Sequence, residues 1–196
     1  MQQFPSKKTL ICAKQKFLPR GGVKMGTETL FLVKKAKQSD TAAFAELYSL
    51  YADDMFRYAL YMLKNREDAQ DAVQDAALTA WKHIKSLRSD ELFKAWLFKI
   101  LSNRCKKCLT EKSKAPDALP DEYELISPEN GDAFLFEKSE ITEALCTLTP
   151  PDGQIVLLSV IGGFSSSELA RIFNMPPGTV RSKQKRALEK LRAKLS

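Results

Sequence analysis

The segment that decides the fold class is SSSELARIFNMPPGTVRSKQKR, residues 165–186. Ser165 and Glu168 have capping-box spacing, in which the serine hydroxyl accepts from the start of a helix and the glutamate bonds back to the serine N–H. A tight turn follows, and then two prolines, which suit a first helical turn because its N–H groups have no partner there. The pattern predicts a helix over 165–174 and a second helix over 176–195.

The second of these helices is apolar on one face and basic on the other. Its inward stripe is Val180, Ala187, Leu188, Leu191 and Leu195. Its outward side chains are Arg181, Ser182, Lys185 and Arg186, with Lys183 at the flank. Two helices joined by a short turn, the second one basic outside, are typical of a helix-turn-helix whose second helix enters the major groove of duplex DNA. A helical hairpin with a solvated basic face is the alternative that the pattern leaves open.

The N-terminal half shows helical periodicity rather than strand alternation. We expect helices over 30–37, from a cap at Asp40 through 62, from a cap at Asn65 through 84, and from Asp90 through 109. The second of these carries one continuous apolar stripe, made of Phe44, Leu47, Tyr51, Met55, Tyr58 and Met62. The fourth turns Phe93, Leu97, Ile100, Leu101 and Leu109 inward. These stripes predict a buried helical core.

Charge is segregated along the 196 residues, whose net charge of +7 favours a polyanionic partner. Residues 82–109 hold eight basic and two acidic side chains, and residues 178–196 hold seven basic and one acidic. Residues 111–136 hold seven acids and two bases among prolines, a composition that predicts a linker. We therefore expect an all-α protein with a disordered basic lead over 1–26, a helical domain over 27–110, a flexible acidic linker over 111–136 and a helix-turn-helix domain over 137–196.

Membrane insertion, metal binding and catalysis all lack support in the sequence. No apolar run approaches the roughly 20 residues of a membrane span, and residues 9–13 are too short for a signal-peptide core, so we expect a cytoplasmic protein. Cys105 and Cys108 form one CxxC, but with no second pair and a single histidine we expect packed thiols rather than a zinc site. No glycine-rich phosphate loop is visible. We expect no catalytic residue, no metal and no cofactor.

Two blocks of the sequence resemble the extracytoplasmic-function group of bacterial RNA polymerase sigma factors. The first is EDAQDAVQD at 67–75 through Trp81, followed by FKAWL at 93–97 and Asn103-Arg104, which is similar to region 2. The second is LTPP at 148–151, IVLL at 155–158 and GTVRSK at 178–183, which is similar to region 4. The resemblance covers roughly 27–110 and 137–193. It implies a factor that binds core RNA polymerase, recognises the −10 and −35 promoter elements and enables transcription initiation.

The resemblance also implies roles for individual residues. The helix after Asn65 would dock on the clamp helices of the largest polymerase subunit through Asp71, Gln74 and Asp75, and the two carboxylates do share a face at i and i+4. The unpaired −10 strand would lie on the next helix, contacted by Lys94, Lys99, Asn103, Arg104 and Lys107, with a flipped base in the loop over 87–91. The −35 duplex would be read by Thr179, Arg181, Ser182, Lys183, Lys185 and Arg186. The outer surface of the second domain would touch the polymerase flap, and an anti-sigma factor is an expected partner.

Three interpretations stay open at this point. Trp96 could pack in the core or stack on a base. An ordinary DNA-binding regulator would explain the second domain, but it would leave the acidic helix after Asn65 without a role. A thiol oxidoreductase that uses Cys105 and Cys108 would need a low-pKa thiolate at a helix start, usually beside a βαβ pattern, and the sequence shows neither.

Overall fold

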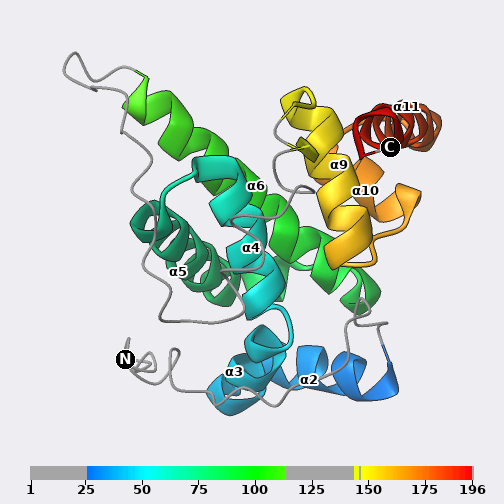
Figure 1. Cartoon of the computed structure of the whole chain (residues 1–196). Helices are drawn as coiled ribbons and strands as arrows, with labels where there is room; N and C mark the ends of the chain where they lie inside the picture. The colour runs from blue at the N-terminus through cyan, green and yellow to red at the C-terminus, as the bar shows by residue number, and fades with distance from the viewer. Residues whose placement is uncertain (1–25, 114–143, 146, 196) are drawn as a thin grey trace.

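The computed structural model describes residues 26–113, 144–145 and 147–195. All regular structure within these ranges is helical (Figure 1), which confirms the predicted all-α class. The predicted basic lead over 1–26 lies outside the described residues except for Gly26, and so does the predicted acidic linker beyond residue 113.

The N-terminal module begins and ends its helices close to the predicted positions. Its elements are α2 (Thr27–Lys37), α3 (Thr41–Ser49), α4 (Ala52–Leu63), α5 (Arg66–His83), the 3-10 turns η1 (Ile84–Ser86) and η2 (Asp90–Leu92), and α6 (Phe93–Lys112). Both predicted N-caps are confirmed: the Asp40 carboxylate accepts from the Ala43 N–H, and the Asn65 side-chain oxygen accepts from the Asp68 N–H, each at 3.0 Å.

The single helix predicted from Asp40 through 62 is wrong, because the chain forms two helices there. Helix α3 ends at Ser49, and Tyr51, with φ −120° and ψ −7°, precedes α4. The Ser49 hydroxyl donates to the Glu46 carbonyl, which offers the backbone an alternative to continued helix. The apolar stripe continues across the break because Leu47 in α3 and Met55 in α4 are both buried.

Helix α5 packs tightly between α4 and α6 because its inner face is almost all alanine. Ala69, Ala72, Ala76, Ala77 and Ala80 are buried on this face. Such small side chains allow neighbouring helix axes to approach closely. The outer face of α5 stays in solvent and is held in a fixed position by this packing.

The C-terminal module contains α9 (Pro150–Ile161), α10 (Ser166–Phe173) and α11 (Pro177–Leu195). The predicted capping box is confirmed, since the Glu168 N–H donates to the Ser165 hydroxyl and the Glu168 carboxylate accepts from the Ser165 N–H. Asn174 adopts the left-handed conformation (φ 54°) that ends α10 and turns the chain into α11. Of the helix predicted over 136–148, only residues 144–145 and 147–148 are described.

Three leucines predicted to face inward are exposed: Leu109, Leu188 and Leu195. Leu109 and Leu195 lie near the C-terminal ends of α6 and α11, where the apolar period continues but the partner helices no longer cover it. Leu188 is followed by the buried Leu191, and it is exposed because it lies two turns after Arg181, on the solvent side of α11. Periodicity identifies a helix face, whereas burial requires a neighbour at that height.

The two modules pack against each other, which the sequence pattern did not predict. Helix α10 lies on α6 and α9 lies on α4 (Figure 1). The Tyr58 hydroxyl hydrogen-bonds with the Ser102 hydroxyl at 3.1 Å and the Gln154 side-chain oxygen at 3.3 Å, all three residues being buried. A Cβ added to Gly153 would lie 2.0 Å from the Tyr61 hydroxyl oxygen, which is too close for a side chain at this position. Gly153 therefore permits the close approach of α9 to α4.

Candidate nucleic-acid and polymerase interfaces

Helix α11 presents a basic face to solvent. Thr179, Arg181, Ser182, Lys185 and Arg186 are exposed, while Val180, Ala187 and Leu191 on the other side are buried. Arg186 Nε donates to the Ser182 carbonyl at 3.3 Å, and the Ser182 hydroxyl donates to the Gly178 carbonyl at 3.0 Å. These bonds stay within the helix, so the face remains accessible to a ligand. A groove-binding helix needs this arrangement.

Lys183 is held inside the module rather than on the basic face. Its ammonium lies 2.9 Å from the Asp152 carboxylate at the start of α9, and its side chain is 23% exposed. Burial alone would raise the pKa of Asp152, but hydrogen bonds from Lys183 and Thr149 outweigh it and lower the pKa. Lys183 was predicted to contact DNA, and in this structure its charge ties α11 to α9.

Gly178 is a position that sequence reasoning did not select. It is exposed in the first turn of α11, and a Cβ added to it would meet no atom within 4 Å. Neither packing nor a positive φ in the chain requires glycine here. A glycine that the fold does not need, at the end of the helix that would enter a groove, is suited to a close approach by DNA backbone.

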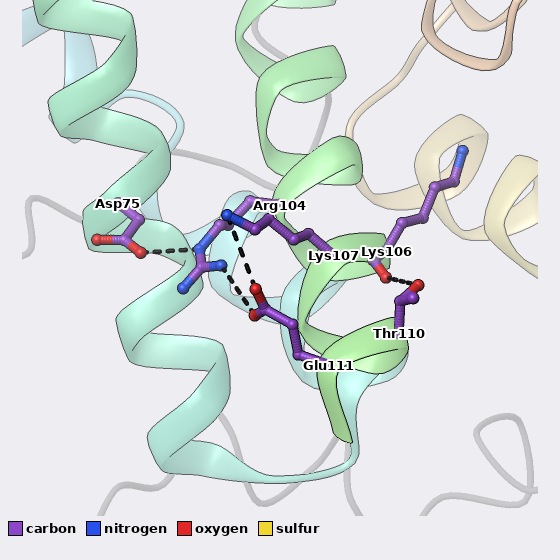
Figure 2. A network of polar contacts seen from close by, with 6 residues as sticks. All are labelled: Asp75, Arg104, Lys106, Lys107, Thr110 and Glu111. Carbon is purple, nitrogen blue, oxygen red and sulfur yellow. Dashed lines mark hydrogen bonds and ion pairs between the residues drawn. The ribbon is translucent and has the colours of Figure 1, made fainter. Parts of the chain in front are cut away.

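The predicted polymerase-binding residues occupy the outer face of α5. Asp71 is exposed and Gln74 is half-buried. Asp75 accepts a hydrogen bond from Arg104 Nε at 2.7 Å (Figure 2), and its side chain remains 48% exposed. None of these residues is sealed in the core. The structure therefore keeps a carboxylate face available, with Asp71 as its most accessible charge.

Arg104 is the centre of a small ion-pair network between α5 and α6. Besides Asp75, it lies 3.7 Å from the Glu111 carboxylate, which is also 3.7 Å from Lys107 (Figure 2). Burial acts to lower the pKa of Arg104, but Cys108, Asp75 and Glu111 raise it, and the net change is upward. Asp75 and Arg104, predicted for two different partners, thus bind each other in this state.

The outer face of α6 carries further basic residues. Lys99, Asn103 and Lys107 are exposed as predicted for a nucleic-acid surface. Lys106, which sequence reasoning omitted, belongs to the same stripe because it lies three residues after Asn103 and seven after Lys99. Its side chain is exposed and extends away from the ion pairs of Arg104 (Figure 2). The helical spacing could have identified it.

Lys94 differs from the other predicted DNA contacts because it is buried, with 5% of its surface exposed. Its ammonium donates to the Gly162 carbonyl and lies 4.1 Å from the centre of the Phe164 ring. Burial lowers its pKa, while Glu168 and Asp54 act in the opposite direction. In this structure Lys94 cannot contact DNA, because the C-terminal module encloses it.

Two aromatic positions near the loop over 87–91 behave differently. Trp96 is half-buried and its ring contacts that of Phe93 at 6.0 Å, which favours the core interpretation over base stacking. Trp81 lines a cavity of about 270 Å³ at the junction of α2, α5 and η1. The remaining lining residues are Ala36, Ser39, Lys82, Ile84 and Lys85.

The CxxC pair lies within α6 rather than at a helix start. Cys105 is buried and Cys108 half-buried, one turn apart. Burial raises the pKa of the Cys105 thiol to about 12, which keeps it protonated at neutral pH. A thiol oxidoreductase needs the opposite shift, so the structure offers no support for that interpretation.

The fold and these surfaces define a two-module, helix-turn-helix DNA-binding protein. Residues 47–115 match the sequence family described as Sigma-70 region 2, and residues 138–191 match Sigma-70, region 4. The chain is 30% identical to the ECF RNA polymerase sigma factor SigM of Mycobacterium tuberculosis, over 78% of this chain and 76% of that protein. It is also 30% identical to the ECF RNA polymerase sigma-E factor of Escherichia coli, over 81% and 89% of the two chains.

Solved structures share this fold. The structure of CnrH in complex with the cytosolic domain of CnrY matches with a TM-score of 0.66 and 24% identity, over 86% of this chain and 97% of that one. The sigma factor RpoE in complex with the anti-sigma factor NepR, from Bartonella quintana, matches with a TM-score of 0.57 and 22% identity, over 86% and 94%.

The chain belongs to the extracytoplasmic-function sigma factors of bacterial RNA polymerase. Its function is promoter recognition for transcription initiation, and members of this family act as non-enzymatic initiation factors. In the part of the chain that the structure describes, no helix is long and apolar enough to cross a membrane.

Proposed function

We propose that the two modules divide the work of initiation between polymerase docking, −10 strand binding and −35 duplex reading. The face of α5 with Asp71, Gln74 and Asp75 docks on the clamp helices of the largest polymerase subunit. The outer face of α6 binds the unpaired −10 strand, and the basic face of α11 reads the −35 duplex. The observation that carries the proposal is that three separate solvent-exposed faces, one each on α5, α6 and α11, carry the charges these partners need.

The −35 surface is the most sharply defined of the three. Thr179, Arg181, Ser182, Lys185 and Arg186 are exposed together, opposite the buried side of α11. Their arginines and lysine can neutralise phosphates, and their N-terminal members lie where a groove-binding helix contacts base edges. Lys183 contributes indirectly by fixing α11 to α9 through Asp152.

The −10 surface combines cations on α6 with the cavity beside Trp81. Lys99, Asn103, Lys106 and Lys107 are exposed along one stripe, and Arg104 adds a cation once it leaves Asp75. The cavity lies at η1, which leads into the loop over 87–91, and it offers an indole ring and two lysines. Aromatic rings and cations are the groups that bind unpaired bases and their phosphates.

Docking on the polymerase uses carboxylates against basic partner residues. Asp71 is accessible as it stands, whereas Asp75 must exchange Arg104 for a polymerase residue or share it. The outer surface of the C-terminal module touches the polymerase flap. We further propose that the protein acts in the cytoplasm, has no catalytic activity of its own and is held inactive by an anti-sigma factor, as the two structural relatives are solved with partner proteins.

The decisive experiment combines reconstituted initiation with duplex binding. Purified chain and core polymerase should start transcripts at promoters that core polymerase alone ignores. Arg181→Ala should weaken −35 duplex binding by about 1–3 kcal/mol if Arg181 reads a base, or reduce the salt slope by about one phosphate contact if it does not. Lys190→Ala removes an exposed charge nine residues further along α11, on the side of the helix that faces away from Arg181, and should change neither.

Two results would count against the proposal. If the chain binds duplex DNA but confers initiation on no genomic template, it acts as an ordinary regulator. If Arg181→Ala and Lys190→Ala have equal effects, the basic face of α11 does not define the −35 surface.

A further inference from the structure

The contact between the modules centres on the turn from α9 to α10. Helix α9 ends at Ile161 with Gly162 as its C-cap, and Gly163 takes a left-handed conformation with φ 59°. The N–H groups of Gly162 and Phe164 both donate to the Leu158 carbonyl, at 3.1 and 3.3 Å. This turn directs the Phe164 ring onto α6, where it meets Phe98 edge-on with ring centres 4.8 Å apart.

Lys94 completes this end of α9 from the other module. The last carbonyls of a helix have no partner within it, and the helix dipole makes that end partly negative. The Lys94 ammonium supplies both a donor and a positive charge there, because it donates to the Gly162 carbonyl and lies over the Phe164 ring. A cation from α6 therefore caps α9 across the boundary between the modules.

Gly162 is required by the geometry of this contact. A Cβ at Gly162 would lie 2.4 and 2.6 Å from two atoms of the Phe164 ring. The backbone of Gly162 (φ −87°, ψ −7°) is open to any residue, so the ring is the main obstacle. Gly162→Ala should therefore displace Phe164 and leave both the carbonyl at position 162 and Lys94 in the chain.

We propose that Lys94, Gly162 and Phe164 form a latch that holds the helix-turn-helix module against α6 in the free chain. Release of the latch is needed before Lys94 and the first turns of α6 can reach promoter DNA. Closure and DNA binding by Lys94 exclude each other because the ammonium that caps α9 is buried, so a phosphate cannot reach it. The second part of this inference rests on the proposed −10 surface, whereas the latch itself does not.

Lysine acylation of the full-length chain measures the latch without DNA or polymerase. With limiting N-hydroxysuccinimidyl acetate and peptide mass spectrometry, Lys94 should react roughly tenfold or more slowly than the exposed Lys99 on the same helix. Gly162→Ala should raise the Lys94 rate about tenfold or more, as expected for loss of a hydrogen bond to a charged group, and leave Lys99 unchanged. Equal rates for Lys94 and Lys99 in the parent chain would overturn the latch.

A second pair of variants tests the same contact from the other side. Lys94→Ala should speed amide exchange over residues 157–164 about tenfold, and Lys99→Ala should not. A variant that has unfolded is recognised by its loss of helix content and of −35 duplex affinity. If Gly162→Ala unfolds, Phe164→Leu is used in its place. Unchanged exchange in Lys94→Ala would refute the capping role.

Addition of core polymerase and promoter DNA tests the release step separately. If Lys94 leaves the Gly162 carbonyl in the complex, amide exchange over residues 157–164 should be faster in the complex than in the free chain. Exchange is measured on peptides obtained by digestion after quenching. Exchange that stays slow in a complex active in initiation would show that DNA binding does not require release, while the latch measured in the free chain would stand.

Discussion

The ion pair between Asp75 and Arg104 gives a prediction whose size follows from its exposure. Arg104 Nε lies 2.7 Å from Asp75 Oδ2, but the Asp75 side chain is 48% exposed and that of Arg104 is 27% exposed. Solvent therefore screens the attraction strongly. Pairs of this kind contribute about 0.2–1 kcal/mol to the free energy of unfolding. We expect Asp75→Ala and Arg104→Ala each to cost less than about 1 kcal/mol, with a coupling of about 0.5 kcal/mol in the double variant.

This double-mutant cycle is measured by urea unfolding of the parent, the two single variants and the double variant, monitored by far-ultraviolet circular dichroism. A domain of ordinary stability keeps nearly all of its molecules folded after a loss of about 1 kcal/mol. Changes in function therefore report on binding: Asp75→Ala should weaken core polymerase affinity, and Arg104→Ala should lower promoter-dependent initiation while core affinity holds.

The opposite outcome is equally specific. A coupling above about 2 kcal/mol would mean that the pair behaves as a buried one and stabilises the packing of α5 on α6. Functional losses in either variant would then follow from that packing. The assignment of Asp75 to the polymerase and Arg104 to DNA would lose its support.

Three further outcomes are expected. Asp71→Arg should reduce core polymerase binding at least about fivefold and leave −35 duplex binding intact, while Glu46→Arg, the same charge change at an exposed site on α3, should do neither; equal effects would remove Asp71 from the docking face. Gly178→Ala should raise thermal stability by up to about 1 kcal/mol and yet weaken duplex binding, and unchanged affinity in anisotropy titrations would show that DNA does not approach this glycine. Because the pKa of Asp152 is lowered in the folded chain, its pair with Lys183 stabilises the module above about pH 4 and is lost as pH falls further; Asp152→Asn should flatten this acid dependence, and parallel unfolding curves for parent and variant would contradict it.

Local signals in the sequence predicted most helix starts. Asp40, Asn65 and the Ser165–Glu168 capping box act within four residues, so their geometry follows from spacing alone. The break between α3 and α4 was missed because no glycine or proline marks it. The exposure of Leu195 was missed because burial depends on a neighbouring helix, which periodicity does not contain.

The candidate site was predictable to the same extent. Arg181, Lys185 and Asp71 are exposed on the expected helix faces, since amphipathic spacing fixes which side of a helix meets the core. The partners of Lys94 and Lys183 come from other elements, 68 and 31 residues away in the chain. Contacts over such separations leave no trace in local patterns, so two basic residues of similar appearance acquired structural partners.

The alanine-lined inner side of α5 has a consequence for engineering. The core packing of this helix falls on its concealed wall, whereas its solvent wall contacts neighbouring residues at Arg66, Asp68 and Asp75, through Phe56, Lys112 and Arg104. The remaining outward positions can be randomised at little cost to stability. A library confined to these positions would be a practical starting point for a sigma factor that binds an engineered polymerase and not the native one. The helix would still fold after charge reversals that prevent binding to the native polymerase.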